Sequence, residues 1–249
     1  MFESIRGKRV LVTGGTGGIG SAIVQMFADH GARVGIHCHR NRAQAKTLQE
    51  ALGREGRESE CFEADLTQPA EAKRLMDRFV QRFQGIDVLI NNAGAVSGTG
   101  GFQTLSEEDW DRTFALNVRA PFFLAQAALP HMRKQAQGRI INISSIAAKY
   151  GGAVNSLHYA ASKAALETMT RGLARWCAPD GIQVSAIRGG FIETAFHEKM
   201  GQTDTQARIQ QIPLKRPGHP MDIARTALFL ASDGGNFITG EIVTVAGGD

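Results

Sequence analysis

The 249-residue sequence is poor in cysteine and in long apolar stretches, and each scarcity argues against a class of protein. Its three cysteines, Cys38, Cys61 and Cys177, show neither a CxxC pair nor cysteine–histidine ligand spacing, which disfavours a disulfide framework or a metal site and favours the cytoplasm. The longest mostly apolar stretch, residues 120–130, is too short to span a bilayer, so we expect no membrane association. The first ten residues lack an apolar core, so we expect no signal peptide.

An excess of charge of one sign is also lacking. The 28 basic and 24 acidic residues leave a net charge of +4, dispersed along the chain except for the basic segment His37–Arg42. Nucleic-acid-binding proteins concentrate positive charge on one face or stripe, so we expect no nucleic-acid partner. Glycine, in contrast, is abundant: its 29 residues have no fixed period, which excludes a collagen-like chain.

Short apolar runs alternate with helical patterns along the chain. The strand-like runs are 9–12, 33–36, 60–63, 87–90, 139–143, 182–187 and 242–245, and helical patterns lie at 19–30, 42–55 and 70–83. This alternation is typical of a parallel sheet that helices bury on both faces. We therefore predict an α/β fold with one doubly wound sheet of about seven strands, in a single domain over residues 1–249.

The first predicted strand runs into Thr13–Gly20, a glycine-rich loop that leads into a helix. Glycine has no Cβ, so its backbone can turn sharply and approach a ligand closely. The start of a helix presents free N–H groups and the positive end of its dipole, which suits a pyrophosphate. The loop therefore favours nucleotide binding over the alternative, a tight strand–helix turn without a ligand.

The spacing of Gly14, Gly18 and Gly20 resembles the T-G-x-x-x-G-x-G motif of the short-chain dehydrogenase/reductase family. Further matches follow in the family's order over nearly the whole chain: Asp65-Leu66, Asn91–Gly94, Asn117, Ser144-Ser145, Tyr159-x-x-x-Lys163, Phe191–Thr194 and Gly247-Gly248. The sequence is most similar to the 3-oxoacyl-(acyl-carrier-protein) reductase branch. The resemblance implies a Rossmann-type fold and hydride transfer between a nicotinamide cofactor and a ketone, aldehyde or secondary alcohol.

The end of the second predicted strand bears on the choice of cofactor. An acidic residue there would bind the adenosine ribose 2′-hydroxyl and repel a 2′-phosphate, but the strand ends in His37-Cys38-His39-Arg40. The Arg40 guanidinium can bind a phosphate in a bidentate manner, and His39 and Arg42 could add charge. We predict NADP(H), with NAD(H) as the alternative cofactor; the alternative interpretation of the segment itself is a solvated basic loop.

The resemblance also implies which residues hold the cofactor. Asp65 would contact the adenine, Lys163 the nicotinamide ribose, and Ile192 and Thr194 the carboxamide. The full predicted set is Gly14, Thr16, Gly18, Ile19, Gly20, His39, Arg40, Asn41, Asp65, Leu66, Asn92, Ala93, Gly94, Tyr159, Lys163, Gly190, Ile192 and Thr194.

Tyr159 and Lys163 are four residues apart in a predicted helix, so they share one helix face. A phenol has a pKa of about 10, and a nearby ammonium group favours the phenolate and lowers that pKa. The pair is therefore a workable acid–base unit for a carbonyl or an alcohol, although the same spacing occurs in ordinary surface pairs. The resemblance implies that Ser145 hydrogen-bonds the substrate oxygen, with Ser144 as the competing choice.

Two further positions carry paired alternatives. The resemblance implies that Asn117 holds a water in a proton relay from Lys163 to solvent; the alternative is a polar core residue that kinks its helix. Arg188-Gly189-Gly190 stands where the family usually has Pro-Gly, so we expect a looser turn at Gly189. Arg188 either faces the pocket and attracts an anionic substrate or is a solvated or structural arginine.

Three segments are expected to contact the substrate: 96–102, 146–157 and 191–211, of which the last would form a lid. Tyr150, the other of the two tyrosines, either lines the pocket or packs. A small ketone, aldehyde or alcohol competes as substrate with a 3-oxoacyl carrier protein. The positions where that branch binds its acidic carrier hold Ala136-Gln137 and Asp180 instead of basic residues, which weakens the second choice.

The resemblance also implies a homotetramer, formed through helices within 111–133 and 162–177. A second class of function stays open, a non-catalytic dinucleotide-sensing protein, because a fold does not imply an activity. The combination of Tyr159, Lys163, Ser145 and Asn117 favours the oxidoreductase.

Overall fold

Seven parallel strands form one sheet in the residues that the structure, a computed structural model, describes: 2–98, 100–194 and 205–249. The strands are β1 (Arg9–Val12), β2 (Arg33–Cys38), β3 (Ser59–Glu63), β4 (Val88–Asn91), β5 (Gly138–Ser145), β6 (Ile182–Gly189) and β7 (Ile242–Val245). Their order is β3-β2-β1-β4-β5-β6-β7, and all neighbouring strands are parallel. The prediction of a doubly wound α/β sheet is therefore confirmed.

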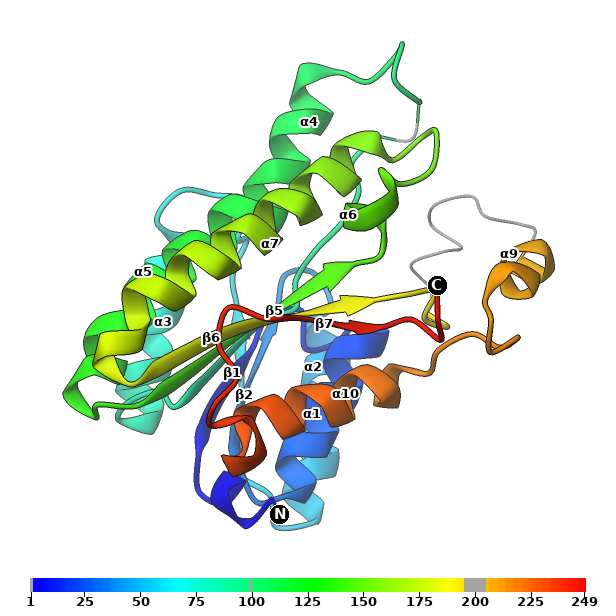
Figure 1. Cartoon of the computed structure of the whole chain (residues 1–249). Helices are drawn as coiled ribbons and strands as arrows, with labels where there is room; N and C mark the ends of the chain where they lie inside the picture. Colours follow the sequence, from blue (N-terminus) through cyan, green and yellow to red (C-terminus); the bar gives the residue numbers. More distant parts are fainter. Residues whose placement is uncertain (1, 99, 195–204) are drawn as a thin grey trace.

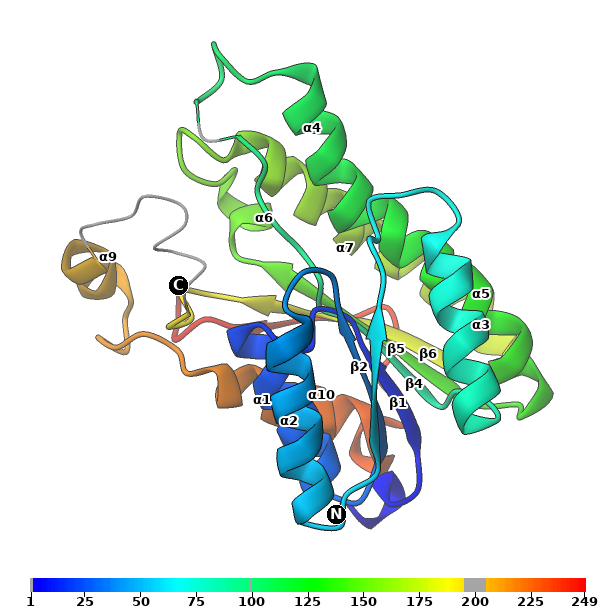
Figure 2. The ribbon, with the colours of Figure 1, turned by 180° about the vertical axis from the view of Figure 1, so that it is seen from behind.

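Helices cover both faces of the sheet (Figures 1 and 2). On one face lie α1 (Gly18–Asp29), α2 (Arg42–Arg54) and α10 (Pro220–Ala231); on the other lie α3 (Glu71–Phe83), α4 (Glu107–Phe114), α5 (Ala120–Lys134) and α7 (Leu157–Cys177). The short segments are η1 (Glu3–Ile5), α6 (Ala147–Tyr150), η3 (Ala178–Asp180), α9 (Thr205–Gln211), η4 (Asp233–Gly235) and the π-helical η2 (Ala115–Arg119) between α4 and α5. No described helix is both long and apolar enough to cross a membrane.

Each face of the sheet has its own apolar core, since the strands are buried on both sides. Phe27 of α1 packs in the core beneath α1, α2 and α10. Phe79 and Phe83 of α3 pack in the other core, with ring centroids 4.9 Å apart. Burying a large apolar side chain contributes about 1.5–3 kcal/mol. The continuous apolar runs that predicted the strands therefore contribute side chains to the apolar cores on both faces of the sheet.

The order of the strands reverses between β1 and β4, where the chain switches from one side of the sheet to the other. Ligands of such sheets bind in the crevice outside the carboxyl ends of the strands at this switch point. The glycine-rich loop follows β1 there, and Asn92–Gly94 follows β4. Both predicted segments therefore lie where the topology places a ligand.

β5 and β6 are longer than predicted, reaching Ser145 and Gly189. The register pairs Ser144 with Arg188 and Ser145 with Gly189. Gly189 thus remains inside the ladder, and its carbonyl accepts a 2.7 Å hydrogen bond from the Ile146 amide. Gly189 is therefore a paired strand residue, contrary to the expectation of a loose turn at this position.

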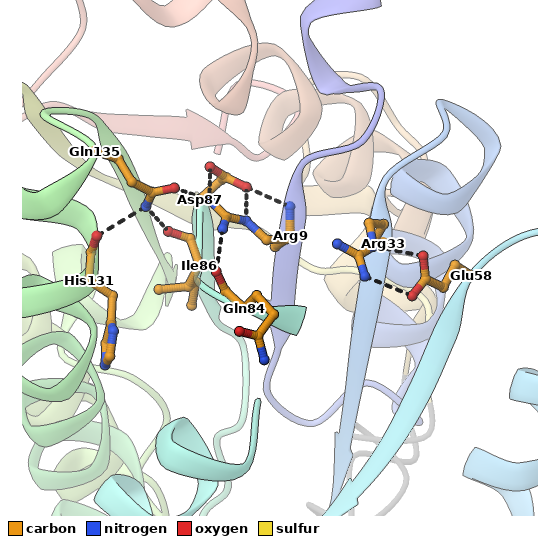
Figure 3. Close-up of polar contacts among 8 residues, drawn as sticks. All are labelled: Arg9, Arg33, Glu58, Gln84, Ile86, Asp87, His131 and Gln135. Atoms are coloured by element: carbon orange, nitrogen blue, oxygen red, sulfur yellow. Dashed lines mark hydrogen bonds and ion pairs between the residues drawn. The ribbon is translucent and has the colours of Figure 1, made fainter. Parts of the chain in front are cut away.

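The opposite, amino edge of the sheet is braced by polar contacts (Figure 3). Asp87, directly before β4, accepts hydrogen bonds from the Arg9 backbone at 2.8 Å and from its guanidinium at 2.7 and 2.8 Å. Gln135, just after α5, contacts Arg9 and donates to the carbonyls of Ile86 and His131. These bonds tie the amino ends of β1 and β4 to the end of α5, at the end of the sheet opposite the ligand crevice.

Candidate active site

The glycine-rich loop turns tightly between β1 and α1. Gly14 has φ +62°, a conformation that side chains rarely adopt, and a Cβ at Gly20 would overlap its carbonyl oxygen. Gly17 and Gly18 are exposed, and no side chain caps the start of α1. The first N–H groups of the helix therefore face the crevice, as a pyrophosphate site requires.

The end of β4 is bonded to this loop. The Thr13 hydroxyl accepts hydrogen bonds from the amides of Asn92 and Ala93 at 3.0 and 2.9 Å. The Asn92 side-chain amide donates to the carbonyls of Thr13 and Gly14 at 2.9 and 3.0 Å. Asn92, Ala93 and the loop therefore form one rigid unit at the switch point, as their predicted shared site requires.

His37 is an additional anchor of the loop that sequence reasoning did not assign to the site. It is 2% exposed; its Nδ1 accepts a 3.0 Å hydrogen bond from the Gly14 amide, and its Nε2 faces the Ala64 carbonyl at 3.0 Å. Burial lowers the pKa of His37 to about 4, although the Ala64 carbonyl opposes that shift. His37 is therefore a neutral imidazole that joins the loop to the end of β3.

Acidification should test this anchor. An unfolded histidine takes up a proton near its ordinary pKa of about 6.5, whereas folded His37 does so only near 4. The stability that it contributes is therefore present above pH 6.5 and is lost as the pH falls to 4, by about 3 kcal/mol in total.

Urea unfolding measures the free energy of unfolding at pH 7 and at pH 5. Between these two pH values, His37→Asn should lose less of that free energy than wild type. The His131→Gln control should behave like wild type, and an equal loss in all three proteins would contradict the prediction.

Basic residues surround the carboxyl ends of β2 and β3, at a cavity of about 610 Å³ that His39, Arg42 and Asp65 help to line. Arg42 lies 3.5 Å from Glu63, and His39 lies 3.7 Å from Asp65. Arg40 is exposed and forms no ion pair with the residues that the structure describes. Arg40 is therefore the guanidinium of this group that is available to a ligand.

Asp65, predicted at the adenine, is already engaged with the protein. Its Oδ1 accepts hydrogen bonds from the Thr67 amide at 3.0 Å and the Thr67 hydroxyl at 2.7 Å. Burial raises the pKa of Asp65, but the hydrogen bonds from Thr67 outweigh it and hold that pKa below its ordinary value. Asp65 stabilises the turn that carries Leu66, whose side chain is buried in the apolar core under α3.

The segment after β6 meets the glycine-rich loop. A Cβ at Gly18 would lie 2.7 Å from Thr194 Cγ2, and one at Gly190 would lie 2.7 Å from Ala246 Cα. Ile192 is 3% exposed and bridges to Gly218. Thr194 therefore reaches the start of α1 at Gly18, and Ile192 holds the segment before it against Gly218. Residues 195–204 of the predicted lid lie outside the described residues, and α9 forms its end.

Tyr159, Lys163 and Ser145 come together at the carboxyl edge of the sheet. Tyr159 is hydrogen-bonded to the Ser145 side chain, and Lys163 Nζ lies 5.7 Å from the centroid of the Tyr159 ring. Lys163 Nζ donates to the Ile143 carbonyl at 2.8 Å, and a Cβ at Gly94 would lie 3.0 Å from Nζ. The helix spacing thus gives the predicted shared face, and β5 supplies the serine.

The expected direction of the Tyr159 pKa shift was wrong. Burial raises the pKa of Tyr159 to about 12, and the hydrogen bond with Ser145 opposes that rise. Burial likewise lowers the pKa of Lys163 to about 8, opposed by the charge of Glu167. Removal from water disfavours the charged form of each group, and it is the dominant cause of both shifts. Tyr159 is therefore a phenol at neutral pH.

Ser144 and Ser145, the competing candidates, have opposite environments. Ser144 is 5% exposed and donates a 2.7 Å hydrogen bond to Glu167. Ser145 is half-buried and contacts Tyr159. The Ser144 hydroxyl is therefore engaged by Glu167, and Ser145 is the serine that contacts Tyr159.

Asn117 lies in the π-helical η2 and is fully buried. Its side chain accepts from the Ala95 amide at 3.0 Å and donates to the Ala95 carbonyl and the Ser162 hydroxyl, both at 2.9 Å. Such π-helical turns are rare and occur frequently at functional sites. Asn117 therefore braces the loop after β4 against α7, next to Lys163; a water relay through it stays a prediction.

Arg188 does not face the substrate region as an isolated cation. Its guanidinium binds the carboxylate of Glu167, with Nε–Oε1 2.9 Å and Nη2–Oε2 2.5 Å. The structural alternative for Arg188 is thus the right one. Glu167 was missed from the sequence, although it stands four residues after Lys163 on the buried face of α7.

A cavity of about 400 Å³ lies between the start of α4 with the loop before it and the start of α7 with the residues before it. Phe102, Leu105, Trp110, Val154 and Leu157 line it together with His158, whose Nε2 lies 2.7 Å from the Ser97 carbonyl. Phe102, Val154 and Leu157 fall in two of the three segments predicted to contact the substrate, whereas Trp110 on α4 lies outside them. Tyr150 is 58% exposed, its hydroxyl accepts from the ammonium of its neighbour Lys149, and it is not in this lining.

The topology and the site define a Rossmann-type α/β protein with a tyrosine–lysine–serine group beside a glycine-rich helix start. A family model described as enoyl-(acyl carrier protein) reductase matches residues 14–249. A 3-oxoacyl-[acyl-carrier-protein] reductase of Thermotoga maritima is 35% identical over 244 residues, 98% of each chain. The chain therefore belongs to the short-chain dehydrogenase/reductase family of oxidoreductases, within the branch similar to 3-oxoacyl-[acyl-carrier-protein] reductases.

Two solved structures are similar over nearly the whole chain. A blue fluorescent protein from a metagenomic library, in complex with NADPH, has a TM-score of 0.90 and 34% identity, with 98% of each chain covered. An NADH-dependent reductase responsible for alginate metabolism has a TM-score of 0.90 and 35% identity, covering 99% of this chain and 98% of its own. The first is in complex with NADPH and the second is described as NADH-dependent, at nearly the same identity, so overall similarity does not determine the cofactor.

Proposed function

We propose that the protein is an NADP(H)-dependent oxidoreductase that transfers hydride between nicotinamide and a ketone, an aldehyde or a secondary alcohol. The observation that carries this proposal is the hydrogen bond between Tyr159 and Ser145, with Lys163 one helix turn away, at the carboxyl edge beside the glycine-rich loop. A substrate oxygen placed between the two hydroxyl groups would receive two hydrogen bonds. The exposed helix start at Gly17 and Gly18 fits a pyrophosphate.

In the direction of reduction, the bound cofactor supplies the hydride to the carbonyl carbon. Ser145 holds the carbonyl oxygen, and Tyr159, which is protonated at neutral pH, donates the proton that this oxygen needs. The Lys163 ammonium stabilises the phenolate that Tyr159 leaves behind. Asn117 keeps the loop after β4 against Lys163, so these groups need not reorganise during the reaction.

Arg40 supports NADP(H) over NAD(H). Glu63 and Asp65, at the end of β3 and just after it, lie 3.5 Å from Arg42 and 3.7 Å from His39, while Arg40 is exposed and carries no ion pair among the described residues. A planar guanidinium binds a phosphate through two parallel hydrogen bonds. The metagenomic relative bound to NADPH is consistent with this choice.

Arg40→Ala is expected to weaken NADPH binding about tenfold or more, because a charge-assisted bond to the 2′-phosphate is lost. NADH has no 2′-phosphate, so its dissociation constant should change by less than about twofold. Fluorescence titration of each reduced cofactor measures both constants. Arg54→Ala, at an exposed position near the end of α2, serves as the control and should leave both constants unchanged. Equal weakening of NADPH and NADH by Arg40→Ala would refute the phosphate role.

A second candidate is 3-oxoacyl-carrier-protein reduction, favoured by the 35% identical reductase of Thermotoga maritima. The residues at the predicted carrier-binding positions argue against it. Asp180 is paired with Arg133 at 2.7 Å, and Ala136 and Gln137 bring no positive charge to an acidic carrier. We therefore place a small carbonyl compound first.

A cofactor-oxidation screen over ketones, aldehydes and 3-oxoacyl thioesters tests the reaction and the substrate class together. We expect oxidation of NADPH, faster than that of NADH, with at least one small carbonyl compound. Preference for the thioesters would support the second candidate. NADPH binding without turnover on the whole panel would favour the non-catalytic dinucleotide-sensing protein.

We further propose that the protein acts in the cytoplasm as a homotetramer formed through α5 and α7, with residues 191–211 as the lid. Phe122 and Phe123 on α5 are 41% and 45% exposed, and Trp176 on α7 is 60% exposed. Exposed aromatic groups on helices are typical of a protein–protein interface. The three cysteines are free, as expected in a reducing compartment.

A further inference from the structure

Glu167 is a buried carboxylate at the centre of a polar cluster below the candidate catalytic group. It is 4% exposed and accepts hydrogen bonds from Ser144 at 2.7 Å and from Arg188 at 2.9 and 2.5 Å. Arg188 also donates to the Thr244 hydroxyl at 3.3 Å. The cluster thus joins α7 to β5, β6 and β7.

The cluster around Glu167 lies next to two members of the candidate catalytic group, Ser145 and Lys163. Ser144 and Arg188 are paired in the register of β5 and β6, and the next pair along the strands is Ser145 with Gly189. On α7, Glu167 follows Lys163 by one turn, so the two side chains share a face. Glu167 therefore bonds the residue next to Ser145 on β5, and it lies one helix turn after Lys163 on α7.

Burying a carboxylate is costly unless it is paired, and apolar residues of similar volume often stabilise a fold as well or better. The structure assigns Glu167, held by Arg188, as a positioning residue that keeps Lys163 charged and keeps Ser145 facing Tyr159. This inference rests on the proposed function, since it concerns the same catalytic group.

Among the residues that the structure describes, the surroundings of Lys163 leave Glu167 as the charged group that acts on it. The Ile143 carbonyl of β5 accepts from Nζ, and the Asn117 amide oxygen lies near the same space, beside Gly94. Neither is ionised, Tyr159 is a phenol at neutral pH, and Arg188 faces the carboxylate of Glu167. Burial lowers the pKa of Lys163 to about 8, and the charge of Glu167 opposes that fall. Without this charge, Lys163 would lose its proton at a lower pH.

Glu167→Gln removes the charge and keeps an acceptor for Ser144. We expect the pKa of Lys163 to fall by at least about half a unit. The alkaline limb of the pH profile of kcat for carbonyl reduction should move to lower pH by the same amount. NMR titration of 13C-lysine-labelled, cofactor-free protein measures the pKa directly, with the Lys163 signal assigned by its loss in Lys163→Arg. This readout does not depend on turnover, so a failure of the proposed function leaves it intact.

Two further variants separate charge from packing. Ser144→Ala keeps the charge but frees β5 from Glu167, so kcat/KM should fall several-fold while the alkaline limb stays in place. The double variant Glu167→Met with Arg188→Met replaces the ion pair with apolar groups; it should fold and lower the pKa of Lys163 as Glu167→Gln does. Arg171→Gln, at an exposed position on the same helix, is the control and should not move the limb.

A Lys163 pKa that is the same in wild type, Glu167→Gln and the double variant would overturn the electrostatic part of the inference. An unchanged kcat/KM in Ser144→Ala would overturn the positioning part. An equal shift in Arg171→Gln would show a general effect of charge on the helix and would overturn the specific role of Glu167.

Discussion

Tyr159→Phe is expected to lower kcat by about 10³-fold and to leave the dissociation constant of NADPH within about twofold. Phenylalanine keeps the ring but removes the hydroxyl that bonds Ser145 and, in the proposed mechanism, protonates the substrate oxygen. No other phenol lies on this face of α7, because the chain has only two tyrosines and Tyr150 is 58% exposed on α6. Single-turnover NADPH oxidation and cofactor titration measure the two effects separately.

Tyr150→Phe is the matched control, because it makes the same chemical change outside the tyrosine–lysine–serine group. It should lose its contact with Lys149 and change kcat by less than about twofold. If Tyr159→Phe kept substantial turnover, or if Tyr150→Phe lost as much, Tyr159 would not be the proton donor. Loss of both turnover and NADPH binding would instead indicate a folding defect, which circular dichroism detects.

Gly20→Ala is expected to reduce NADPH affinity by about two orders of magnitude, because it disrupts the loop at its tightest point. A Cβ at Gly20 would overlap the Gly14 carbonyl oxygen and lie 2.7 Å from Asn92 Nδ2. The carbonyl cannot move freely, since it also accepts a hydrogen bond from Asn92, and the Gly14 amide is held by His37. The loop must therefore shift away from the geometry that presents the N–H groups of α1.

The matched control is Gly53→Ala on α2, where an added Cβ meets no atom within 4 Å. Alanine favours a helix over glycine by up to about 1 kcal/mol, so this variant should be as stable as wild type or slightly more stable, with unchanged NADPH affinity. Titration and thermal unfolding of both variants give the comparison. A Gly20→Ala protein with wild-type affinity would mean that the cofactor does not depend on this loop.

The local patterns predicted the architecture well for a physical reason. A strand buried on both faces must be apolar throughout, so each run such as residues 182–187 identifies its strand without any tertiary information. The ends of the strands were harder to predict. β5 and β6 extend two residues beyond the carboxyl ends of the predicted runs, because Ser144 pairs with Arg188 and Ser145 with Gly189 although none of the four is a large apolar residue.

The sequence by itself determined the helix face shared by Tyr159 and Lys163 and the glycine-rich turn after β1, since both follow from backbone geometry over a few residues. Only the tertiary structure decided the rest. It placed Ser145 and not Ser144 against Tyr159, paired Arg188 with Glu167, and left Arg40 exposed while Arg42 and His39 met carboxylates. It also raised the pKa of Tyr159, contrary to expectation. These outcomes depend on burial and on partners distant in the chain, and desolvation is a property of the packed site that no local spacing contains.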